Sequence, residues 1–218
     1  MEKQEREVLE RFIVLEGGDG AGTTTQLRII DAALEGARVP HWTTFEPTES
    51  QEGALIRSIL SGSLVRDPGT VARLFSADRN EHVYGKGGIL ETLKEGKAVV
   101  CDRYVLSSLA YQGAACGSDL PWSLNSSFPL PRLLLYFDVP PEQSLDRIRG
   151  RENREIYEVL NFQELVREAY ARSIERLSST RMRIVRVDAS QPLDRVTRHV
   201  LEAIGVELGV ALSAPPVA

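Results

Sequence analysis

Short apolar runs alternate with segments of helical period along most of this chain, and this alternation constrains the fold most. The apolar runs are nearly unbroken, as strands are when both faces of their sheet are covered. Strand–helix alternation of this kind is typical of a parallel sheet between two layers of helices. The expected strands are 12–15, 41–45, 98–101, 132–139 and 183–188. We therefore predict an α/β fold with a five-stranded parallel sheet.

The first expected strand, "FIVL", runs directly into a glycine-rich stretch, "EGGDGAGTTTQ" at 16–26. Gly17 and Gly22 have the spacing of a phosphate-binding P-loop, where backbone N–H groups and a helix N-terminus converge on phosphate oxygens. The motif continues with Lys and then Ser or Thr, whereas this chain has Thr23 and Thr24. Thr24 stands where a hydroxyl binds Mg²⁺ in P-loop proteins. The stretch predicts a P-loop NTPase-type fold without the usual lysine; a glycine-rich turn without a ligand is the alternative.

Polar residues follow the next two expected strands as well. Glu46 and Pro47 come after the second strand, and Asp102 and Arg103 come after the third. Ligands of open parallel sheets bind at the carboxyl ends of the strands, so these residues are expected beside the glycine-rich loop. An ion pair on the surface is the structural alternative for Asp102 and Arg103.

Length and charge limit the remaining classes. The chain has 218 residues and a net charge of −5, with no long basic stretch for nucleic acid and no run of membrane-spanning length. We therefore expect no nucleic-acid or membrane partner. Its two cysteines cannot build a disulfide framework, so we expect a cytoplasmic protein. We expect one domain at 11–206, after an N-terminal extension at 1–10 and before a tail at 207–218.

Four stretches together resemble the thymidylate kinase (dTMP kinase) family. They occur in the order and with the spacing of that family over about 11–204, and they read "FIVLEGGDGAGTTTQ", "LFSADRNEH", "VVCDRYVLSSLAYQG" and "VDASQPLDRV". The resemblance implies transfer of a phosphoryl group from ATP to dTMP with Mg²⁺. It also implies a homodimer and a short helical lid at about 147–158.

The nucleoside pocket is expected around Phe75 and Arg79, which are four residues apart on one face of a predicted helix. An aromatic ring can stack on a pyrimidine, and a guanidinium can donate to the exocyclic O4 of thymine. Spacing alone also allows a core phenylalanine and a solvated arginine, but the resemblance implies the nucleoside-binding role.

Further contacts with dTMP are implied by the resemblance alone. Tyr111 matches a residue that lies against the sugar, and Ser108 and Gln112 match residues near the base. Asp19 matches the carboxylate that accepts a hydrogen bond from the 3′-hydroxyl. Tyr157 matches a lid residue near the acceptor, as does Glu155.

The catalytic residues are implied in the same way. Asp102 is expected to hold Mg²⁺ together with Thr24, and Arg103 to bind the acceptor phosphate. Glu46 belongs to a loop that reads Arg-Glu-Pro in the family, but this chain has Phe45 at the arginine position. Glu46 therefore remains a weaker candidate for the acceptor site.

ATP is expected on the loop and on a later turn. The implied ATP-binding residues are Gly17, Gly18, Asp19, Gly20, Ala21, Gly22, Thr23, Thr24 and Thr25, with Ser190 and Gln191 beside adenine. Family members without an arginine in the loop supply one from the lid, and this loop has Gly20 at that place. Arg151 is the first candidate for the lid donor and Arg154 the second, whereas Arg147 and Arg149 are expected to belong to the preceding helix.

Three other interpretations remain open at this point. A catalytically weak nucleotide-binding relative would explain Thr23, but would not need a complete dTMP pocket and lid. A deoxynucleoside kinase would phosphorylate a nucleoside, and the expected role of Arg103 on an acceptor phosphate argues against it. Thr23 could also be an engineered replacement of lysine.

Overall fold

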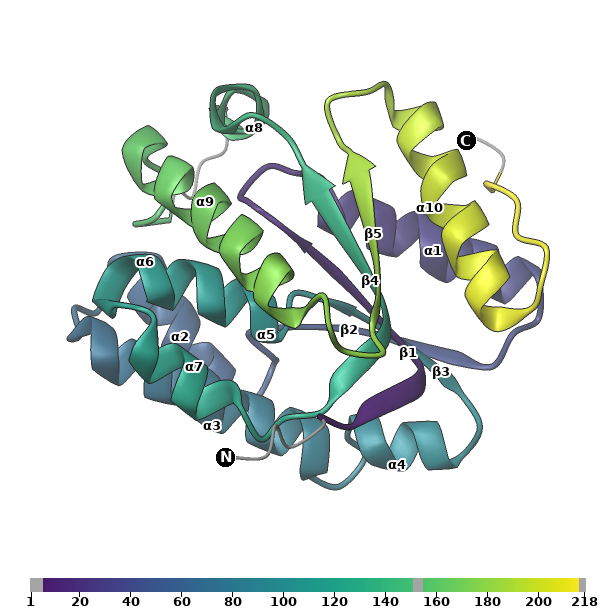
Figure 1. The fold of residues 1–218 in the computed structure, drawn as a ribbon, viewed down its shortest axis with the longest axis horizontal. Coiled ribbons are helices and arrows are strands. Elements are labelled where there is room, and N and C mark those ends of the chain that lie inside the picture. Colours follow the sequence, from purple (N-terminus) through teal and green to yellow (C-terminus); the bar gives the residue numbers. More distant parts are fainter. Residues whose placement is uncertain (1–5, 151–154, 216–218) are drawn as a thin grey trace.

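A five-stranded parallel sheet forms the centre of the protein in a computed structural model that describes residues 6–150 and 155–215 (Figure 1). The strands are β1 (Val8–Gly17), β2 (His41–Phe45), β3 (Ala98–Asp102), β4 (Leu130–Asp138) and β5 (Arg183–Asp188). Their order in the sheet is β2-β3-β1-β4-β5, and every neighbouring pair is parallel. This confirms the predicted α/β fold.

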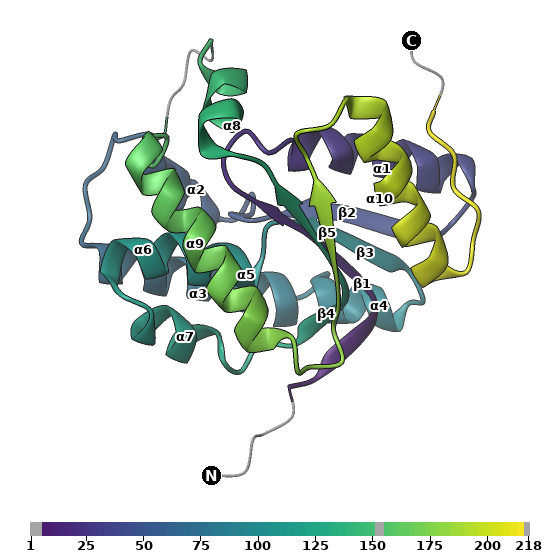
Figure 2. The same ribbon diagram turned by 45° about the horizontal axis from the view of Figure 1, so that its top comes forward.

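Helices cover both faces of the sheet, as the nearly unbroken apolar strands predicted (Figure 2). Two helices, α1 (Thr23–Gly36) and α10 (Leu193–Leu208), lie together on one face. The other helical segments are α2 (Gln51–Leu60), α3 (Pro68–Tyr84), α4 (Ile89–Lys94), α5 (Val105–Ser107), the π-helical turn η1 (Ser108–Gln112), α6 (Gly113–Cys116), α7 (Asp119–Asn125), α8 (Pro141–Ile148) and α9 (Leu160–Leu177). Alternate residues of β1 enter the two cores: Phe12 and Val14 pack on the α9 side, and Ile13 and Leu15 on the α1 side.

The carboxyl ends of the three neighbouring strands β2, β3 and β1 meet at one edge of the sheet. Phe45 of β2 is in register with Asp102 of β3, and Asp102 is in register with Leu15 of β1. The N–H of Arg103 donates to the Leu15 carbonyl at 2.8 Å, and the N–H of Glu46 donates to the Asp102 carbonyl at 3.0 Å. These bonds place the polar residues that follow the strands beside the glycine-rich loop.

The two ends of the predicted domain differ from the expected bounds. β1 begins at Val8, inside the segment 1–10 that was expected to be an extension, because the chain there already pairs with β4. Arg6 also contacts the fold, since its Nη2 donates to the carbonyls of Asn125 and Phe128 at 2.8 and 2.6 Å. At the other end, α10 continues to Leu208, inside the predicted tail.

The segment predicted as a helical lid is partly described. Helix α8 ends at Ile148, so Arg147 belongs to the preceding helix as predicted and Arg149 follows directly after it. Residues 155–158 form a turn rather than a helix, and Arg151 and Arg154 lie outside the described residues. Among the helices that the structure describes, none is both long and apolar enough to cross a membrane.

Candidate active site

A cavity of about 360 Å³ opens at the carboxyl edge of the sheet. Its wall is formed by the glycine-rich loop, the ends of β2 and β3, and parts of α2, α3, η1 and the turn 155–158. The lining residues are Gly18, Asp19, Gly20, Gly22, Thr23, Thr24, Thr25, Leu27, Phe45, Glu46, Pro47, Leu60, Phe75, Asp102, Arg103, Ser107, Tyr111, Gln112, Glu155, Tyr157 and Glu158. The edge predicted to bind a ligand therefore contains a cavity of sufficient size for one.

The glycine-rich loop leads into α1, whose first three amides are unpaired in the described chain. Gly22, the residue before the helix, has a φ of 95°, a left-handed conformation that favours glycine. The backbone N–H groups of Thr23, Thr24 and Thr25 have no acceptor in the described part of the chain. Unpaired amides at a helix N-terminus, together with the helix dipole, attract anions such as phosphate.

Gly20 fits its position because it has no side chain. Its φ is 77°, and a Cβ atom there would lie 2.1 Å from the carbonyl oxygen of Ser144 in α8. The loop and α8 are therefore in direct backbone contact. This packing explains why the loop cannot carry an arginine at Gly20 unless α8 moves.

Asp102 lines this part of the cavity and has one carboxylate oxygen without a partner among the described residues. Its Oδ2 accepts a hydrogen bond from Thr24 Oγ1 at 2.8 Å, whereas its Oδ1 is buried and has no partner among the described residues. A carboxylate and a hydroxyl are hard oxygen ligands of the kind that Mg²⁺ binds. The described residues contain no cluster of three or more His, Cys, Asp or Glu side chains that could hold a metal. The arrangement suits an ion that takes its remaining ligands from phosphate and water.

Asp19 connects the loop to three other elements. Its Oδ1 accepts from Arg103 Nη2 at 2.7 Å and from the Tyr111 hydroxyl at 2.8 Å, and its Oδ2 accepts from Gln163 Nε2 at 2.7 Å. Arg103 also donates to the Gly17 carbonyl at 3.1 Å. Burial raises the pKa of Tyr111 well above its usual value, so the phenol stays protonated and donates to Asp19. The structure thus brings together three residues that the resemblance had assigned to the acceptor: Asp19, Arg103 and Tyr111.

Arg79 does not reach the cavity. Its Nε and Nη2 donate to Glu46 Oε2 at 3.0 and 2.5 Å, and Nη2 also donates to the Tyr104 carbonyl at 2.9 Å. Its Nη1 donates to Ser108 Oγ at 3.1 Å and to Asn125 Oδ1. A guanidinium has five N–H hydrogens, so none remains for the O4 of a base in this arrangement. The predicted contact with the O4 of thymine stays a prediction, and it requires that one of these donors leave its present protein partner.

The guanidinium of Arg79 stays charged although it is buried. Burial alone would lower the pKa of Arg79, but the charge and hydrogen bonds of Glu46 outweigh that effect and raise it. Both side chains are almost fully buried, yet Glu46 still lines the cavity. Arg79 therefore lies behind the wall of the cavity as the counter-ion of Glu46.

The other predicted dTMP residues divide into two groups. Phe75, Gln112 and Tyr157 line the cavity, and Gln112 Oε1 is buried without a partner in the described chain. Ser108 is not among the lining residues, because its hydroxyl accepts from Arg79 behind the wall. The turn that carries Tyr157 is held by the Ile156 N–H, which donates to the carbonyl of Leu60 at 2.9 Å.

The turn predicted to hold adenine lies away from the cavity. The Asp188 carboxylate accepts from Ser190 Oγ at 2.5 Å and from Gln191 Nε2 at 2.9 Å, and these bonds lower the pKa of Asp188. Arg147 of α8 donates to the Ala189 carbonyl at 2.8 Å and so joins this turn to the helix that contacts Gly20.

Comparison with known proteins gives the same family as the motifs. The sequence profile described as thymidylate kinase matches residues 15–200. The chain belongs to the thymidylate kinase family. A putative thymidylate kinase of Treponema pallidum is 40% identical over 197 residues, which cover 89% of this chain and 94% of that protein. A probable thymidylate kinase of Pyrococcus horikoshii is 43% identical over 205 residues, 90% of this chain and 97% of that one. A thymidylate kinase of Clostridium novyi is 35% identical over 200 residues, which cover 87% of this chain and 95% of that protein.

Two buried residues of this thymidylate kinase family member were missed by the sequence analysis. Gln163 of α9 accepts from the Asp19 N–H at 3.2 Å and donates to the Tyr157 carbonyl at 3.0 Å, besides its bond to the Asp19 carboxylate. Glu16 is fully buried and accepts from Ser107 Oγ at 2.6 Å; burial raises its pKa. Both are polar residues at positions where the surrounding pattern predicts an apolar, buried side chain, and this departure could have identified them.

Proposed function

We propose that this protein transfers the γ-phosphoryl group of ATP to dTMP and releases ADP and dTDP. One observation carries the proposal: the residues that line this cavity include several with polar groups that have no protein partner in the described chain. They are the amides of Thr23 to Thr25, Asp102 Oδ1 and Gln112 Oε1, each without an acceptor or donor among the described residues. Buried polar groups are normally paired, so a ligand is expected to complete these. Membership of the thymidylate kinase family supports ATP and dTMP as that ligand pair.

The phosphates of ATP are proposed to bind at the N-terminus of α1. The unpaired amides of Thr23 to Thr25 and the helix dipole favour them there. Thr24 and Asp102 would hold Mg²⁺, which when bound supplies positive charge beside the β- and γ-phosphates. Phosphoryl transfer depends mainly on positioning and charge neutralisation, so no covalent intermediate with the protein is needed.

The acceptor is proposed to bind on the other side of Asp19. Phe75 would stack on the pyrimidine, and the amide of Gln112 would face its edge. Asp19 would accept from the 3′-hydroxyl, and the neutral Tyr111 would pack against the sugar. Arg103, fixed by Asp19 and by the Gly17 carbonyl, would bind the phosphate that is to be extended.

The charge of the missing lysine is proposed to come from the segment after α8. Thr23 lines the cavity but brings no charge, and Gly20 leaves no room for a side chain. This part of the proposal rests on the family resemblance, which favours Arg151 and then Arg154. We expect Arg151→Ala to lower kcat about 10³-fold, as for other arginine fingers, with little change in dTMP binding.

A double-mutant cycle tests this compensation. Thr23→Lys should partly restore the kcat of Arg151→Ala, because both cations would serve the same phosphate charge. If the two substitutions have additive effects on kcat, another group supplies the charge.

Turnover of ATP with four acceptors in parallel tests the function itself: dTMP, dUMP, dCMP and thymidine. We expect the highest kcat/KM with dTMP and none with thymidine, which lacks the phosphate that Arg103 would bind. Preference for thymidine would identify a deoxynucleoside kinase. Nucleotide binding without turnover would identify the catalytically weak relative.

The proposed setting is a cytoplasmic homodimer that acts on small nucleotides and not on nucleic acid. Light scattering coupled to size-exclusion chromatography measures the mass directly. A monomer at micromolar concentration would contradict the dimer without affecting the proposed reaction.

A further inference from the structure

His82 occupies a buried position behind the cavity wall with a partner at each ring nitrogen. Its Nδ1 lies 3.1 Å from Glu46 Oε1, and its Nε2 lies 2.8 Å from Thr44 Oγ1. Only 4% of its side chain is exposed. The ring also meets the edge of Trp42 at a centroid distance of 5.7 Å and an interplanar angle of 82°. Trp42 and Thr44 lie on β2 and His82 lies on α3, so His82 joins that strand to that helix.

The chemistry of the partners determines the tautomer of His82. A carboxylate oxygen can only accept, so Nδ1 must carry the hydrogen that points to Glu46. A threonine hydroxyl can donate, so Thr44 can supply the hydrogen for an unprotonated Nε2. Glu46 thus requires a hydrogen on Nδ1, and the Thr44 hydroxyl, which can donate or accept, pairs with Nε2 in either role.

The Glu46 carboxylate needs this second donor to have a fixed orientation. Arg79 contacts only one of its oxygens, Oε2, through both Nε and Nη2. A carboxylate held through one oxygen can still turn about that contact. His82 donates to the other oxygen, Oε1, which has no other partner among the described residues. Arg79 and His82 together therefore hold the carboxylate from two sides.

We propose that His82 is a positioning residue of the acceptor-nucleotide site, which acts through Glu46. Glu46 lines the cavity, is the counter-ion of Arg79, and precedes Pro47 in the same wall. Holding this carboxylate therefore holds both the wall and the guanidinium behind it. The inference rests on the acceptor site proposed above. It predicts an effect on dTMP binding and not on ATP binding, because the loop that would bind the ATP phosphates makes no contact with His82 in the described chain.

Two amide substitutions separate the roles of the two ring nitrogens. The amide nitrogen of asparagine can take the place of Nδ1, and that of glutamine can take the place of Nε2. His82→Asn thus keeps a donor for Glu46, whereas His82→Gln keeps a partner for Thr44 and loses that donor. His199 is exposed on α10, so His199→Asn and His199→Gln are matched controls.

Steady-state kinetics with dTMP and ATP measure the effect. We expect His82→Gln to raise KM for dTMP about tenfold, as for loss of a hydrogen bond to a charged group, with KM for ATP within about twofold of the parent. His82→Asn should leave both KM values within about twofold. Equal effects of the two substitutions on KM for dTMP would overturn the proposal, as would an effect confined to thermal stability.

A second variant keeps the proposal testable if His82→Gln does not fold. Glu46→Gln preserves the shape of the side chain. If His82 acts through Glu46, this substitution should raise KM for dTMP about tenfold or more, the effect expected for His82→Gln. If KM for dTMP stays within about twofold of the parent in Glu46→Gln, His82 cannot act through Glu46. The parent enzyme gives the separate control on function: without dTMP turnover in the parent, the proposed function fails and not the role of His82.

Discussion

The two ends of the cavity differ in how their polar groups are paired. At the phosphate end, the amides of Thr23 to Thr25 and Asp102 Oδ1 have no partner in the described chain. At the opposite end, Arg79 uses all its donors on Glu46 and neighbouring groups. The first end offers a ligand unpaired groups on the loop and on β3, whereas the charged groups behind the second end are paired within the protein and only Gln112 Oε1 there has no partner among the described residues.

This difference separates residues needed for chemistry from residues needed for folding. Removing a group that has no protein partner costs little stability but removes a contact with the ligand. Removing one member of a buried charged network leaves the other members unpaired in a medium of low polarity. Substitutions at the two ends should therefore have opposite profiles of activity and stability.

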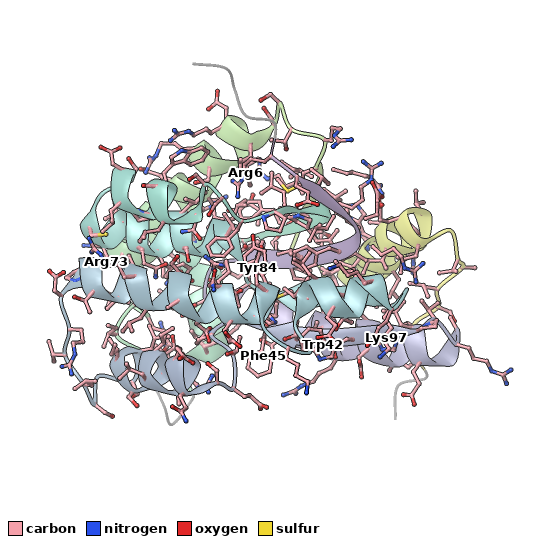
Figure 3. All side chains as sticks on the ribbon, turned by 90° about the horizontal axis from the view of Figure 1, so that it is seen from below. Arg6, Trp42, Phe45, Arg73, Tyr84 and Lys97 are labelled. Carbon is pink, nitrogen blue, oxygen red and sulfur yellow. The ribbon has the colours of Figure 1, made fainter. Side chains whose placement is uncertain are left out.

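Arg79→Ala should have the largest effect on folding. It leaves the buried Glu46 carboxylate without its main counter-ion, which is expected to cost about 3–5 kcal/mol of unfolding free energy. Urea denaturation followed by circular dichroism measures this change. Arg73→Ala on the same helix is the control, since Arg73 is exposed and, among the described residues, donates only to the Gly69 carbonyl of its own helix (Figure 3). Equal stability of the two variants would show that the buried network does not support the fold.

Asp102→Asn should have the reverse profile. The substitution weakens the proposed Mg²⁺ ligand, and we expect kcat to fall about 10²-fold, the scale of one electrostatic contact in a transition state. The melting temperature should change little, because Oδ1 has no protein partner to lose. Asp194→Asn, at an exposed position of α10, is the control. A melting temperature of Asp102→Asn far below that of the parent would show that Asp102 is needed for folding.

Gly20→Ala tests whether the phosphate end also depends on backbone packing. The new Cβ would lie 2.1 Å from the Ser144 carbonyl at a φ of 77°, so the loop or α8 must shift. We expect a loss of about 1–3 kcal/mol in stability together with a higher KM for ATP. Gly36→Ala is the control, because a Cβ there meets no atom within 4 Å. An unchanged KM for ATP would show that the loop tolerates this shift.

Glu16→Gln should have the smallest effect, and it appears as a dependence on pH. The pKa of Glu16 is raised above its usual 4.5 by burial, so the folded protein binds this proton more tightly than the unfolded chain does. Its ionisation therefore lowers the unfolding free energy as the pH rises from 4.5 through the raised pKa. The difference in stability between parent and Glu16→Gln, measured in urea at several pH values, should shift in favour of the variant over that range. A difference independent of pH would contradict the raised pKa.

The sheet and the phosphate end could be predicted because their signals are local. A buried strand, a glycine-rich turn and the start of a helix follow one another in 12–36. The spacing of apolar residues in this segment is enough to predict the strand and the helix. The residues that end β3 also follow from local sequence, since strand ends in a parallel sheet share one edge.

The pairing of buried polar groups could not be predicted in the same way. The spacing of Phe75 and Arg79 gives a common helix face, but it cannot show whether Arg79 donates to a ligand or to Glu46. Gln163 and Asp19 are 144 positions apart, and His82 and Glu46 are 36 apart, so only the folded chain brings each pair together. Each of these groups looks like a solitary polar residue in the sequence.

The contact between Gly20 and Ser144 has a consequence for how this protein can change over generations. Glycine and arginine codons differ by a single base, so mutation readily offers an arginine at this point of the loop. The carbonyl oxygen of Ser144 blocks the first carbon of any such side chain. A lineage of this protein that gains a cation in its phosphate loop must move α8 or acquire a lysine at position 23, where Thr23 already lines the cavity.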